Sequence, residues 1–430
     1  MQSKRDMNRR SFLKRAAAGT AFSFPALVPG SALGAGKAVA PSERITMGII
    51  GTGGQGTGNM NAFLRQRTVQ VVAVCDVDQG HREQAKALVD KRYRNTDCAA
   101  YNDFREVTRR EDIDAVVIAT PDHWHAIPAV DAAQHGKDLY VEKPLTLAIR
   151  QGRVLSDVVK QHGRILQTGS QQRSGATFWK ACMLARNGRL GTIHTISVGI
   201  PGNNRECAPT WQPEPVPAGL DYNFWLGPAP WAEYHSQRCH YTFRFILDYS
   251  GGQVTNFGAH HLDIAQWALD MDESGPIAVS GNGAFPASGL FTTATKVFFE
   301  CSYANGVKLY CKTHGPSIQI EGSEGTVRAT RKDVVSEPAS LLEEDFGSFE
   351  TQLYRSTDHR RNFLECVKTR KAPICPAEVG HRSATVCHLG NIAMRLGRSV
   401  KWDPKAENFG GDDAANALAD RPLRDPWTLG

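Results

Sequence analysis

A glycine-rich turn near residue 50 has the residue types and spacing to hold a phosphate group. Gly51, Gly53 and Gly56 form the pattern G-x-G-x-x-G, with Gln55 inside it, directly after the β-rich run 44–50. Glycines at these positions let the backbone turn tightly and approach a pyrophosphate, which then lies at the positive N-terminal end of the next helix. We therefore predict that this turn, including Gln55, binds a dinucleotide.

An acidic residue after the second predicted strand fits the sugar part of the same ligand. The strand 69–75 ends at Asp76, about 20 residues after Gly56. A carboxylate there accepts hydrogen bonds from ribose hydroxyls and repels a 2′-phosphate. Asp76 thus favours NAD as the cofactor, whereas the nearby His81 and Arg82 leave NADP open.

Lys143 is a candidate for proton transfer. It follows the predicted strand 138–141 inside Glu142-Lys143-Pro144, where the nicotinamide of a bound cofactor should lie. A lysine held partly dry beside the cofactor has a lowered pKa and can relay a proton. The alternative is a surface lysine that merely precedes a proline.

His260 is the second candidate for acid–base chemistry. The polarity pattern before the apolar run 264–269 predicts a helix that begins near residue 259. On such a helix His260 and Asp263 share a face, so Asp263 could orient His260. The alternative is a structural histidine at a helix start whose hydrogen bonds are satisfied.

A polar and aromatic cluster follows residue 230, and sugar sites use this mixture of side chains. Rings stack on pyranose faces, and charged donors hold hydroxyl groups. We select His240 and Arg244 from it as substrate contacts, together with Arg173 after the last strand of the first half. The full cluster is Tyr234, His235, Arg238, His240, Tyr241 and Arg244.

The histidines do not predict a metal site. The pairs His123/His125, His235/His240 and His260/His261 lack an H-x-x-x-H spacing or a clear acidic partner.

Strands and helices alternate in the first half, and this order predicts an α/β fold. Buried strands at 115–119, 138–141 and 164–167 continue the series begun by 44–50 and 69–75. Such βαβ units form a parallel sheet with the ligand at the carboxyl ends of the strands. We therefore predict an N-terminal Rossmann dinucleotide-binding domain.

The second half contains further β-rich segments and ends in a tail. Residues 192–200 and 295–313 are rich in Ile, Val, Phe, Tyr and Thr, as sheet strands are. The proline- and aromatic-rich stretch 207–231 is predicted to be a loop over the site, and the tail is expected to wrap over the body or a neighbouring subunit. The predicted parts are a signal peptide and linker at 1–42, the Rossmann domain at 43–170, a substrate and oligomerisation domain at 171–405, and the tail at 406–430.

The N-terminus carries the pattern of a twin-arginine (Tat) export signal. Arg9 and Arg10 precede Phe12-Leu13 and a modest apolar run, 16–28. Because this route carries folded proteins, it suits an enzyme that takes up its cofactor before crossing, so we expect a periplasmic or otherwise exported protein that engages the Tat machinery. The alternative is an ordinary basic start.

Composition excludes several classes of protein. The 430 residues are 41% hydrophobic and 22% charged, and Lys+Arg exceed Asp+Glu by 50 to 44, with several basic residues in the first 15 positions. Nothing therefore favours a nucleic-acid groove, a membrane-binding face or a multi-span membrane protein. The 10 cysteines contain no C-x-x-C pair, so most are interpreted as small core residues rather than disulfides.

Taken in order, these motifs resemble the Gfo/Idh/MocA family, which includes glucose–fructose oxidoreductase and inositol dehydrogenase. The resemblance rests on the glycine fingerprint, on Ala119-Thr120-Pro121 with His125, on Glu142-Lys143-Pro144, on Trp225-Leu226-Gly227-Pro228 and on the segment 256–263. It covers roughly residues 43–405. It implies a Rossmann domain followed by an α/β domain with an open, mainly antiparallel sheet, a nicotinamide cofactor, carbohydrate substrates and homo-oligomers (dimers or tetramers).

The resemblance also implies roles for individual residues. Thr120, Pro121, His125 and Glu142 would join the cofactor site. The family's Asp-x-x-x-His pair corresponds to Asn256 and His260, and Asn256 cannot accept a proton. Lys143 or His260 is then the base, and Asn256 positions the substrate by hydrogen bonding.

Three functions are compatible with the sequence. The first is an exported NAD(P)-dependent oxidoreductase that transfers a hydride between a sugar, glycoside or cyclitol hydroxyl and a tightly bound nicotinamide. The second is an NAD-dependent glycoside hydrolase or lyase that works by transient oxidation, elimination and re-reduction, although the local motif of such relatives is absent. The third is a non-catalytic sugar-binding protein, against which the phosphate-binding turn, Asp76 and Lys143 argue.

Overall fold

The computed structural model describes residues 39–429. Residues 1–38 of the predicted export signal lie outside the described residues. The chain separates into two units, one ending at Arg44 and one beginning at Ile45. The first contains a short 3₁₀ helix, Pro41–Glu43, and the second contains all the elements below.

The N-terminal part of the second unit is a six-stranded parallel sheet. Its strands lie in the order β3-β2-β1-β4-β5-β6, and every neighbouring pair is parallel. The central strands are short apolar runs buried on both faces, as expected where helices cover both faces of a sheet. The bounds are β1 Ile45–Ile50, β2 Val69–Cys75, β3 Ala99–Tyr101, β4 Ala115–Ile118, β5 Asp138–Val141 and β6 Leu166–Thr168.

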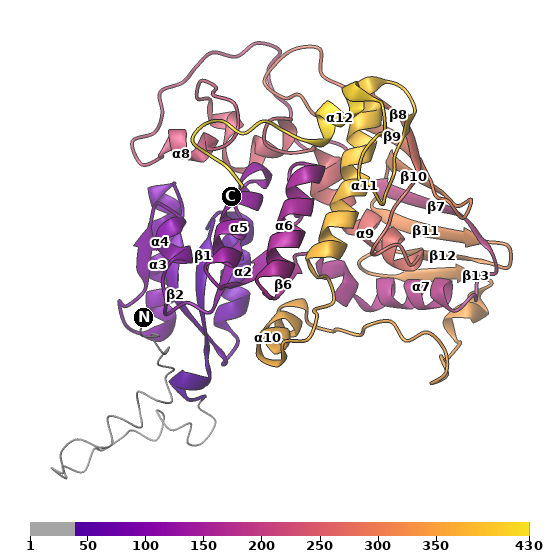
Figure 1. Cartoon of the computed structure of the whole chain (residues 1–430), viewed down its shortest axis with the longest axis horizontal. Helices are drawn as coiled ribbons and strands as arrows, with labels where there is room; N and C mark the ends of the chain where they lie inside the picture. The colour runs from indigo at the N-terminus through magenta and orange to yellow at the C-terminus, as the bar shows by residue number, and fades with distance from the viewer. Residues whose placement is uncertain (1–38, 430) are drawn as a thin grey trace, which may run out of the picture. The chain divides into compact units, whose positions relative to one another are not determined.

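Helices connect these strands and flank the sheet (Figure 1). The strand order is that of a dinucleotide-binding Rossmann fold, in which ligands bind at the carboxyl ends of the strands. The predicted α/β class is therefore confirmed. The helices are α2 Gly54–Leu64, α3 Gln79–Tyr93, α4 Arg105–Thr108, α5 Ala126–Gln134 and α6 Ile149–Gln161.

The C-terminal part contains an open eight-stranded sheet. Its order is β13-β12-β11-β7-β10-β9-β8-β14, and only the β7–β10 pair is parallel. The predicted mainly antiparallel sheet is thus confirmed. The bounds are β7 Ile193–Ile200, β8 Ala278–Ala284, β9 Lys296–Ser302, β10 Lys308–Thr313, β11 Ser317–Gly322, β12 Thr326–Ala329, β13 Val334–Glu337 and β14 Val400–Lys401.

Three helices cover one face of this sheet and separate it from the Rossmann part (Figure 1). They are α7 Ala176–Arg186, α9 Ala259–Ala268 and α11 Ala377–Leu396. Side chains of β9 alternate between buried and exposed, which is the pattern of a sheet packed on one face only. The start of α9 agrees with the predicted helix near residue 259.

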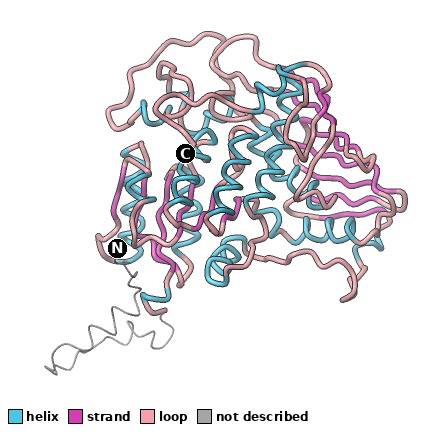
Figure 2. Tube along the Cα trace, viewed as in Figure 1, coloured by secondary structure: helices cyan, strands magenta, loops and turns pink. Residues whose placement is uncertain are grey.

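Long loops and short helices lie at one end of the unit (Figure 2). Residues 201–258 contain α8 Tyr222–Leu226, the 3₁₀ helices Ser236–Arg238 and His240–Phe245, and a π-helical turn Val254–Gly258. Other 3₁₀ helices are Asp122–Trp124, Gln171–Ser174 and Ala339–Leu342. The remaining helices are α10 His359–Thr369 and α12 Asp413–Ala419.

The cysteines agree with the composition argument. All 10 cysteines are free thiols, and every one except the half-buried Cys207 is buried, so their prediction as small core residues is confirmed. Between residues 39 and 429, no helix is long and apolar enough to cross a membrane.

Candidate active site

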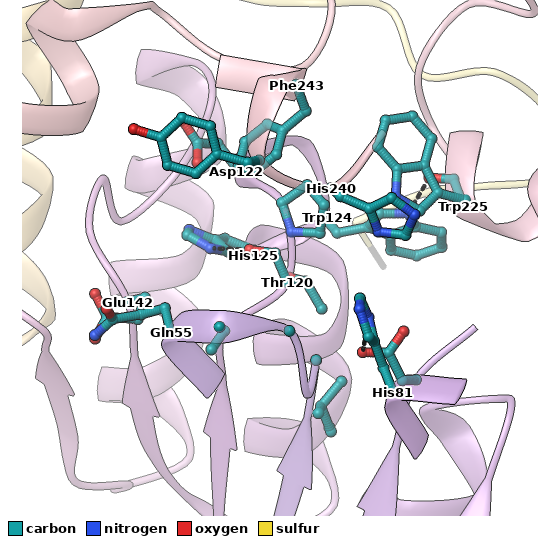
Figure 3. Close-up of a pocket in the computed structure, with 18 of the residues that line it drawn as sticks. Gln55, His81, Thr120, Asp122, Trp124, His125, Glu142, Trp225, His240 and Phe243 are labelled. Atoms are coloured by element: carbon teal, nitrogen blue, oxygen red, sulfur yellow. Dashed lines mark hydrogen bonds and ion pairs between the residues drawn. The ribbon is translucent and has the colours of Figure 1, made fainter. Parts of the chain in front are cut away.

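A cavity of about 700 Å³ lies at the carboxyl ends of β1, β2, β4 and β5. Loops after these strands line one side, and residues 224–225, 240–244 and 256–260 of the second domain line the other. Figure 3 shows Gln55 and Glu142 toward one side of it and His81, His240 and Trp225 toward the other.

The glycine turn forms the cradle predicted from the sequence. Gly51 has φ +84°, and a Cβ there would lie 2.6 Å from the Thr120 backbone nitrogen. A Cβ on Gly56 would lie 1.8 Å from the Gly51 carbonyl oxygen, so only glycine lets α2 pack this closely. Gly53 faces open space in the cavity at the N-terminus of α2, which has no side-chain cap. The turn therefore fits a pyrophosphate.

Asp76 is held at the end of β2 in a position that fits a ribose. Its Oδ2 atom accepts hydrogen bonds from the backbone nitrogen of Thr52 at 2.7 Å and from the Thr52 hydroxyl at 3.1 Å. Its Oδ1 atom accepts one from the backbone nitrogen of Asp78 at 3.0 Å. The carboxylate lines the cavity and keeps unused lone pairs for hydroxyl donors.

The turn after β4 contributes Thr120, Pro121 and His125 to the cavity lining. The Thr120 hydroxyl is buried without a hydrogen-bond partner among the described residues, as expected of a group that meets a ligand. The two ring nitrogens of His125 lie 2.7 Å from the Pro144 carbonyl oxygen and 2.9 Å from that of Thr120. His125 thereby ties together the turns that follow β4 and β5.

Glu142 is buried, and amide groups hold its carboxylate. Its Oε1 atom accepts hydrogen bonds of 2.9 Å from the side chains of Gln55, Asn59 and Gln171. Gln55 therefore reaches across the glycine turn to Glu142. Both residues were predicted to bind the cofactor, and this network fixes their positions beside the cradle.

Lys143 lies in the same cavity and is held by neutral oxygen atoms. Its Nζ atom donates to the Asn256 carbonyl oxygen at 2.7 Å and lies 3.3 Å from the Asn256 amide oxygen. Burial lowers the pKa of Lys143; the charges of Glu142 and Asp122 oppose this shift, and those of Arg244 and Arg331 add to it. The following bond to Pro144 is cis.

His260 lines the cavity close to Lys143. Burial lowers the pKa of His260 well below its usual value, and the charges of Lys143 and Arg331 lower it further. The ring is therefore neutral. Its Nδ1 atom is buried without a hydrogen-bond partner among residues 39–429.

Arg244 and several rings form another part of the wall. Arg244 donates to the Asn256 amide oxygen at 3.3 Å and to the Tyr241 carbonyl oxygen at 2.7 Å. Its guanidinium lies 4.6 Å from the Tyr241 ring centroid and 4.8 Å from that of Phe243. Trp124 and Trp225 also face the cavity, which gives it the mixture of rings and donors that sugar sites use.

His240 lies toward the end of the cavity that Asp76 marks. Its ring centroid is 5.1 Å from that of His81, and its Nε2 atom is 3.8 Å from the Asp78 carboxylate. Ligand atoms of Asp78, His81 and His240 all lie within 4.8 Å of one another, a donor set that could hold a cation. The spacing of the histidines predicts no acidic partner for His240, because Asp78 is remote along the chain. His240, predicted to contact substrate, thus stands beside the predicted ribose site.

The structure corrects two expectations for the second domain. Arg173 does not line the cavity; it is 1% exposed, and it pairs with Asp263 at 2.8 Å and with Asp272 at 2.6 Å. Asp263 accordingly orients Arg173 and accepts from the Ser383 hydroxyl at 2.6 Å, rather than orienting His260. His260 and Asp263 lie within one turn of α9, but each contacts different neighbours because other elements pack around the helix.

Arg331 is a cavity residue that no sequence pattern predicts, and it enters from the turn between β12 and β13. Its guanidinium lies 4.9 Å from the Phe257 ring centroid. No local signal marks this residue, because only the sheet topology brings the turn to the site.

Two family models match most of the described chain. Residues 45–170 match the model of the oxidoreductase family's NAD-binding Rossmann fold, and residues 206–429 match that of its C-terminal alpha/beta domain. Residues 45–170 therefore form an NAD-binding domain.

Similar curated proteins carry glycosidase names. An alpha-N-acetylgalactosaminidase of Shewanella oneidensis is 34% identical over 163 residues, which are 34% of this chain and 35% of that protein. A glycosyl hydrolase family 109 protein of another Shewanella strain is 34% identical over 173 residues, 36% of this chain and 38% of that protein. The matches span only about a third of the length of these relatives.

Solved structures with the same fold cover nearly the whole second unit. The WlbA dehydrogenase of Bordetella pertussis, solved with NADH and UDP-GlcNAcA, has a TM-score of 0.63 at 17% identity and covers 84% of this chain and 99% of its own. The aldose–aldose oxidoreductase of Caulobacter crescentus, solved with glycerol, has a TM-score of 0.63 at 18% identity and covers 83% and 99%. With both domains matched in order, the chain belongs to the Gfo/Idh/MocA family of NAD-binding oxidoreductases.

Proposed function

We propose that this protein transfers a hydride between a hydroxyl-bearing carbon of a sugar, glycoside or cyclitol and a nicotinamide cofactor. The observation that carries the proposal is the place of Lys143. Its amine shares one cavity with the glycine cradle, Asp76 and the neutral His260. A proton acceptor and a dinucleotide site are thereby within reach of the same substrate.

The side chains of this cavity have separate roles in the oxidation of an alcohol. The nicotinamide, when bound, accepts or returns the hydride. Lys143 in its neutral form accepts the hydroxyl proton, and Asn256 holds the amine in place through two oxygen atoms. His260 offers its free Nδ1 atom to a second hydroxyl. The rings of Trp124 and Trp225 exclude water and pack against the substrate.

The first experiment is to denature the purified protein and to identify any released nucleotide by mass spectrometry. We expect stoichiometric NAD(H), with NADP(H) a minor species, because Asp76 repels a 2′-phosphate. A protein that carries no nucleotide and binds none in calorimetry would contradict the proposal.

A second candidate is glycoside cleavage with no net redox change. Oxidation of a ring carbon acidifies the neighbouring C–H bond, after which elimination of the glycosidic oxygen, addition of water and re-reduction release the sugar. The curated relatives named as glycosidases favour this candidate. It predicts that aryl glycosides are cleaved without accumulation of free NADH, whereas a simple dehydrogenase accumulates NADH and leaves the bond intact.

We further propose that the protein is exported with its cofactor in place. Contacts at the Asp76 end of the cavity support retention of the nucleotide. Gln79 donates its backbone N–H to the Gly219 carbonyl at 2.8 Å, and Asp221 donates to that of Val77 at 3.0 Å, so the two domains are joined there. Fractionation of cells that express the full chain tests the compartment, and an Arg9→Lys/Arg10→Lys variant should remain inside.

We also propose a homo-oligomer that uses the open face of the C-terminal sheet. Phe298 is 47% exposed on β9 and stacks on Tyr310 of β10 with ring centroids 6.4 Å apart. Replacement Phe298→Glu should reduce the mass measured by light scattering, whereas Phe349→Glu on an exposed loop should not. An equal mass for all three proteins would contradict this interface.

A further inference from the structure

The Lys143 amine and the guanidiniums of Arg244 and Arg331 line the cavity, and the hydrogen-bond partners of Lys143 and Arg244 are neutral. Lys143 and Arg244 both donate to Asn256, whose amide oxygen lies 3.3 Å from each. The other partners are the backbone oxygens of Asn256 and Tyr241. An uncharged side-chain oxygen therefore lies between the Lys143 amine and the Arg244 guanidinium.

Arg331, an exposed side chain, has no hydrogen bond or ion pair within residues 39–429. Its guanidinium carbon lies 4.9 Å from the Phe257 ring centroid. Partial burial lowers the pKa of Arg331, and no carboxylate opposes that effect. The same guanidinium lowers the pKa of Lys143 and of His260. Arg331 is thus close enough to affect the reacting groups and has no counter-charge of its own.

Burial lowers the pKa of Lys143 and the charges of Glu142 and Asp122 oppose that shift, whereas no carboxylate affects the pKa of Arg331. Asp122 accepts a hydrogen bond of 2.6 Å from the Ser250 hydroxyl, and amide groups surround Glu142. Asp76 and Asp78 lie together at the ribose end, beside His81. In the described part of the chain, neither of the two guanidiniums nor the Lys143 amine forms an ion pair. Arg244 and Arg331 are therefore available to pair with an anion in the cavity.

We propose that the substrate is a sugar that carries a fixed negative charge, and that Arg244 and Arg331 bind this charge beside Lys143. The inference rests on the proposed function of the cavity and names its substrate class. A guanidinium presents a planar fork of donors that suits a carboxylate, a sulfate ester or a phosphate ester. An anionic substituent would pair with both guanidiniums and thereby fix the orientation of the ring.

Asn256 is the residue that makes the site depend on the charge of the ligand. A carboxylate at this position would pair with both Lys143 and Arg244. Because the amide of Asn256 is neutral, it forms no ion pair with these side chains, and they remain available to an anionic substrate. The replacement Asn256→Asp should therefore weaken the binding of an anion and favour a neutral sugar, although the two side chains have nearly the same shape.

The first test measures anion binding without any chemistry. Calorimetric titration of the NAD-loaded protein with inorganic sulfate, against chloride at equal ionic strength, should show saturable binding. Arg331→Gln and Asn256→Asp should each weaken it about tenfold or more. Arg398→Gln is the matched control, because Arg398 already pairs with Asp412 at 2.6 Å on the surface. Circular dichroism and thermal melting verify that each variant is folded.

The outcomes distinguish a specific anion site from adventitious binding of sulfate. Binding that is absent from the wild-type protein, or that persists in Arg331→Gln, would overturn the inference. Binding that is lost in both cavity variants and kept in Arg398→Gln would support it. Because the protein is loaded with NAD, the phosphate cradle is filled and cannot account for the signal.

The second test compares matched sugars. Methyl glucuronide is compared with methyl glucoside and methyl galacturonide with methyl galactoside, and each neutral sugar is also tested as its 6-sulfate and 6-phosphate. We expect one anionic class to exceed its neutral partner at least tenfold in kcat/KM, and Arg331→Gln to abolish the difference. A neutral sugar that is preferred throughout would overturn the inference. Failure of every sugar to react, with Arg331-dependent sulfate binding intact, would contradict the proposed function alone.

Discussion

Lys143 shows how a short sequence motif acquires its chemistry from distant residues. The motif places the lysine at the end of β5, but its partners come from Asn256 of the second domain. Burial lowers the pKa of this amine, and the charges of Arg244 and Arg331 lower it further against the opposing effect of Glu142 and Asp122. The local environment therefore favours the neutral form that a base requires.

Replacement of Lys143 by methionine tests this role. We expect kcat for sugar oxidation to fall about 10²–10⁴-fold, the usual contribution of a positioned acid–base group. Nucleotide content should stay within about twofold of the wild-type value, because the glycine cradle and Asp76 are untouched. Unchanged turnover would favour a non-catalytic sugar-binding protein. The measurement combines steady-state kinetics with mass spectrometry of the released nucleotide.

The pH profile gives a second test of the same residue. Burial, Arg244 and Arg331 lower the pKa of Lys143, so the neutral amine forms at lower pH than for an ordinary lysine. The rate of oxidation should rise with pH through this lowered pKa. Arg331→Gln removes one cation, so the rising limb should move to higher pH. If the rate rises at the same pH in both proteins, the group that titrates is not Lys143.

At the scale of the elements, α9 is anchored by a buried charge network rather than by its active-site histidine. Arg173 pairs with Asp263 of α9 and with Asp272, and its guanidinium lies 5.1 Å from the Trp267 ring centroid. Both carboxylates keep the pKa of Arg173 well above its usual value despite burial. The network fixes the helix that carries His260.

Removal of Arg173 should destabilise the protein strongly. Arg173→Met leaves two carboxylates without their cation, and breaking a buried pair in this way costs about 3–5 kcal/mol. Arg398→Met, which breaks an exposed pair with Asp412, should cost no more than about 1 kcal/mol. Urea denaturation measures both changes. Equal values would mean that the buried network adds nothing specific.

The tail contributes a second anchor through Glu407. This side chain binds His381 of α11 at 3.0 Å and Arg153 of α6 at 2.8 Å. Burial alone would raise the pKa of Glu407, but the hydrogen bonds from His381 and Arg153 lower it to about 2. One carboxylate thus joins a helix of each domain.

Stability should depend on this carboxylate in acid. A carboxyl group whose folded pKa is depressed stabilises the protein above its unfolded pKa of about 4.5 and loses that effect as the pH falls toward about 2. The loss is at most about 3 kcal/mol. Glu407→Gln should be less stable at neutral pH and should show a smaller decline below pH 4.5. Glu365→Gln, an exposed control on α10, should follow the wild-type curve.

At the scale of the whole second unit, the tail closes over the wall of the cavity. The Trp427 ring centroid lies 4.7 Å from that of Trp124 and 5.3 Å from that of Phe224, both of which face the cavity. Arg424 fastens the same segment by donating to the Gly227 carbonyl at 2.8 Å. The expected wrapping of the tail over the body is therefore observed.

Loss of the Trp427 ring should affect both stability and binding. Trp427→Ala removes a half-buried ring, and we expect a loss of about 1–3 kcal/mol with a higher KM for the sugar, because Trp124 and Phe224 lose their support. Trp231→Ala is the control, since Trp231 is 66% exposed. Thermal melting and steady-state kinetics supply the two readouts. Similar behaviour of both variants would assign the tail no role in the cavity.

Much of the fold and half of the site follow from local sequence patterns. The glycine turn, Asp76 and the motif around Lys143 each follow a short apolar strand, and parallel strands bring their carboxyl ends together. Spacing alone therefore placed the cofactor side of the cavity. The start of α9 and the strands of the second sheet likewise follow from periodicities of a few residues.

Tertiary structure alone decided which side chains of the second domain face the substrate. Helical spacing placed Asp263 beside His260, yet packing turned Asp263 toward Arg173 and withdrew both from the cavity. Arg331 entered through a turn that only the strand order brings near Lys143. Local patterns report which face of an element is apolar, whereas the partner of a buried charge depends on which distant element encloses it. For that reason the sequence determined the cofactor site, and the fold determined the charge of the site beside it.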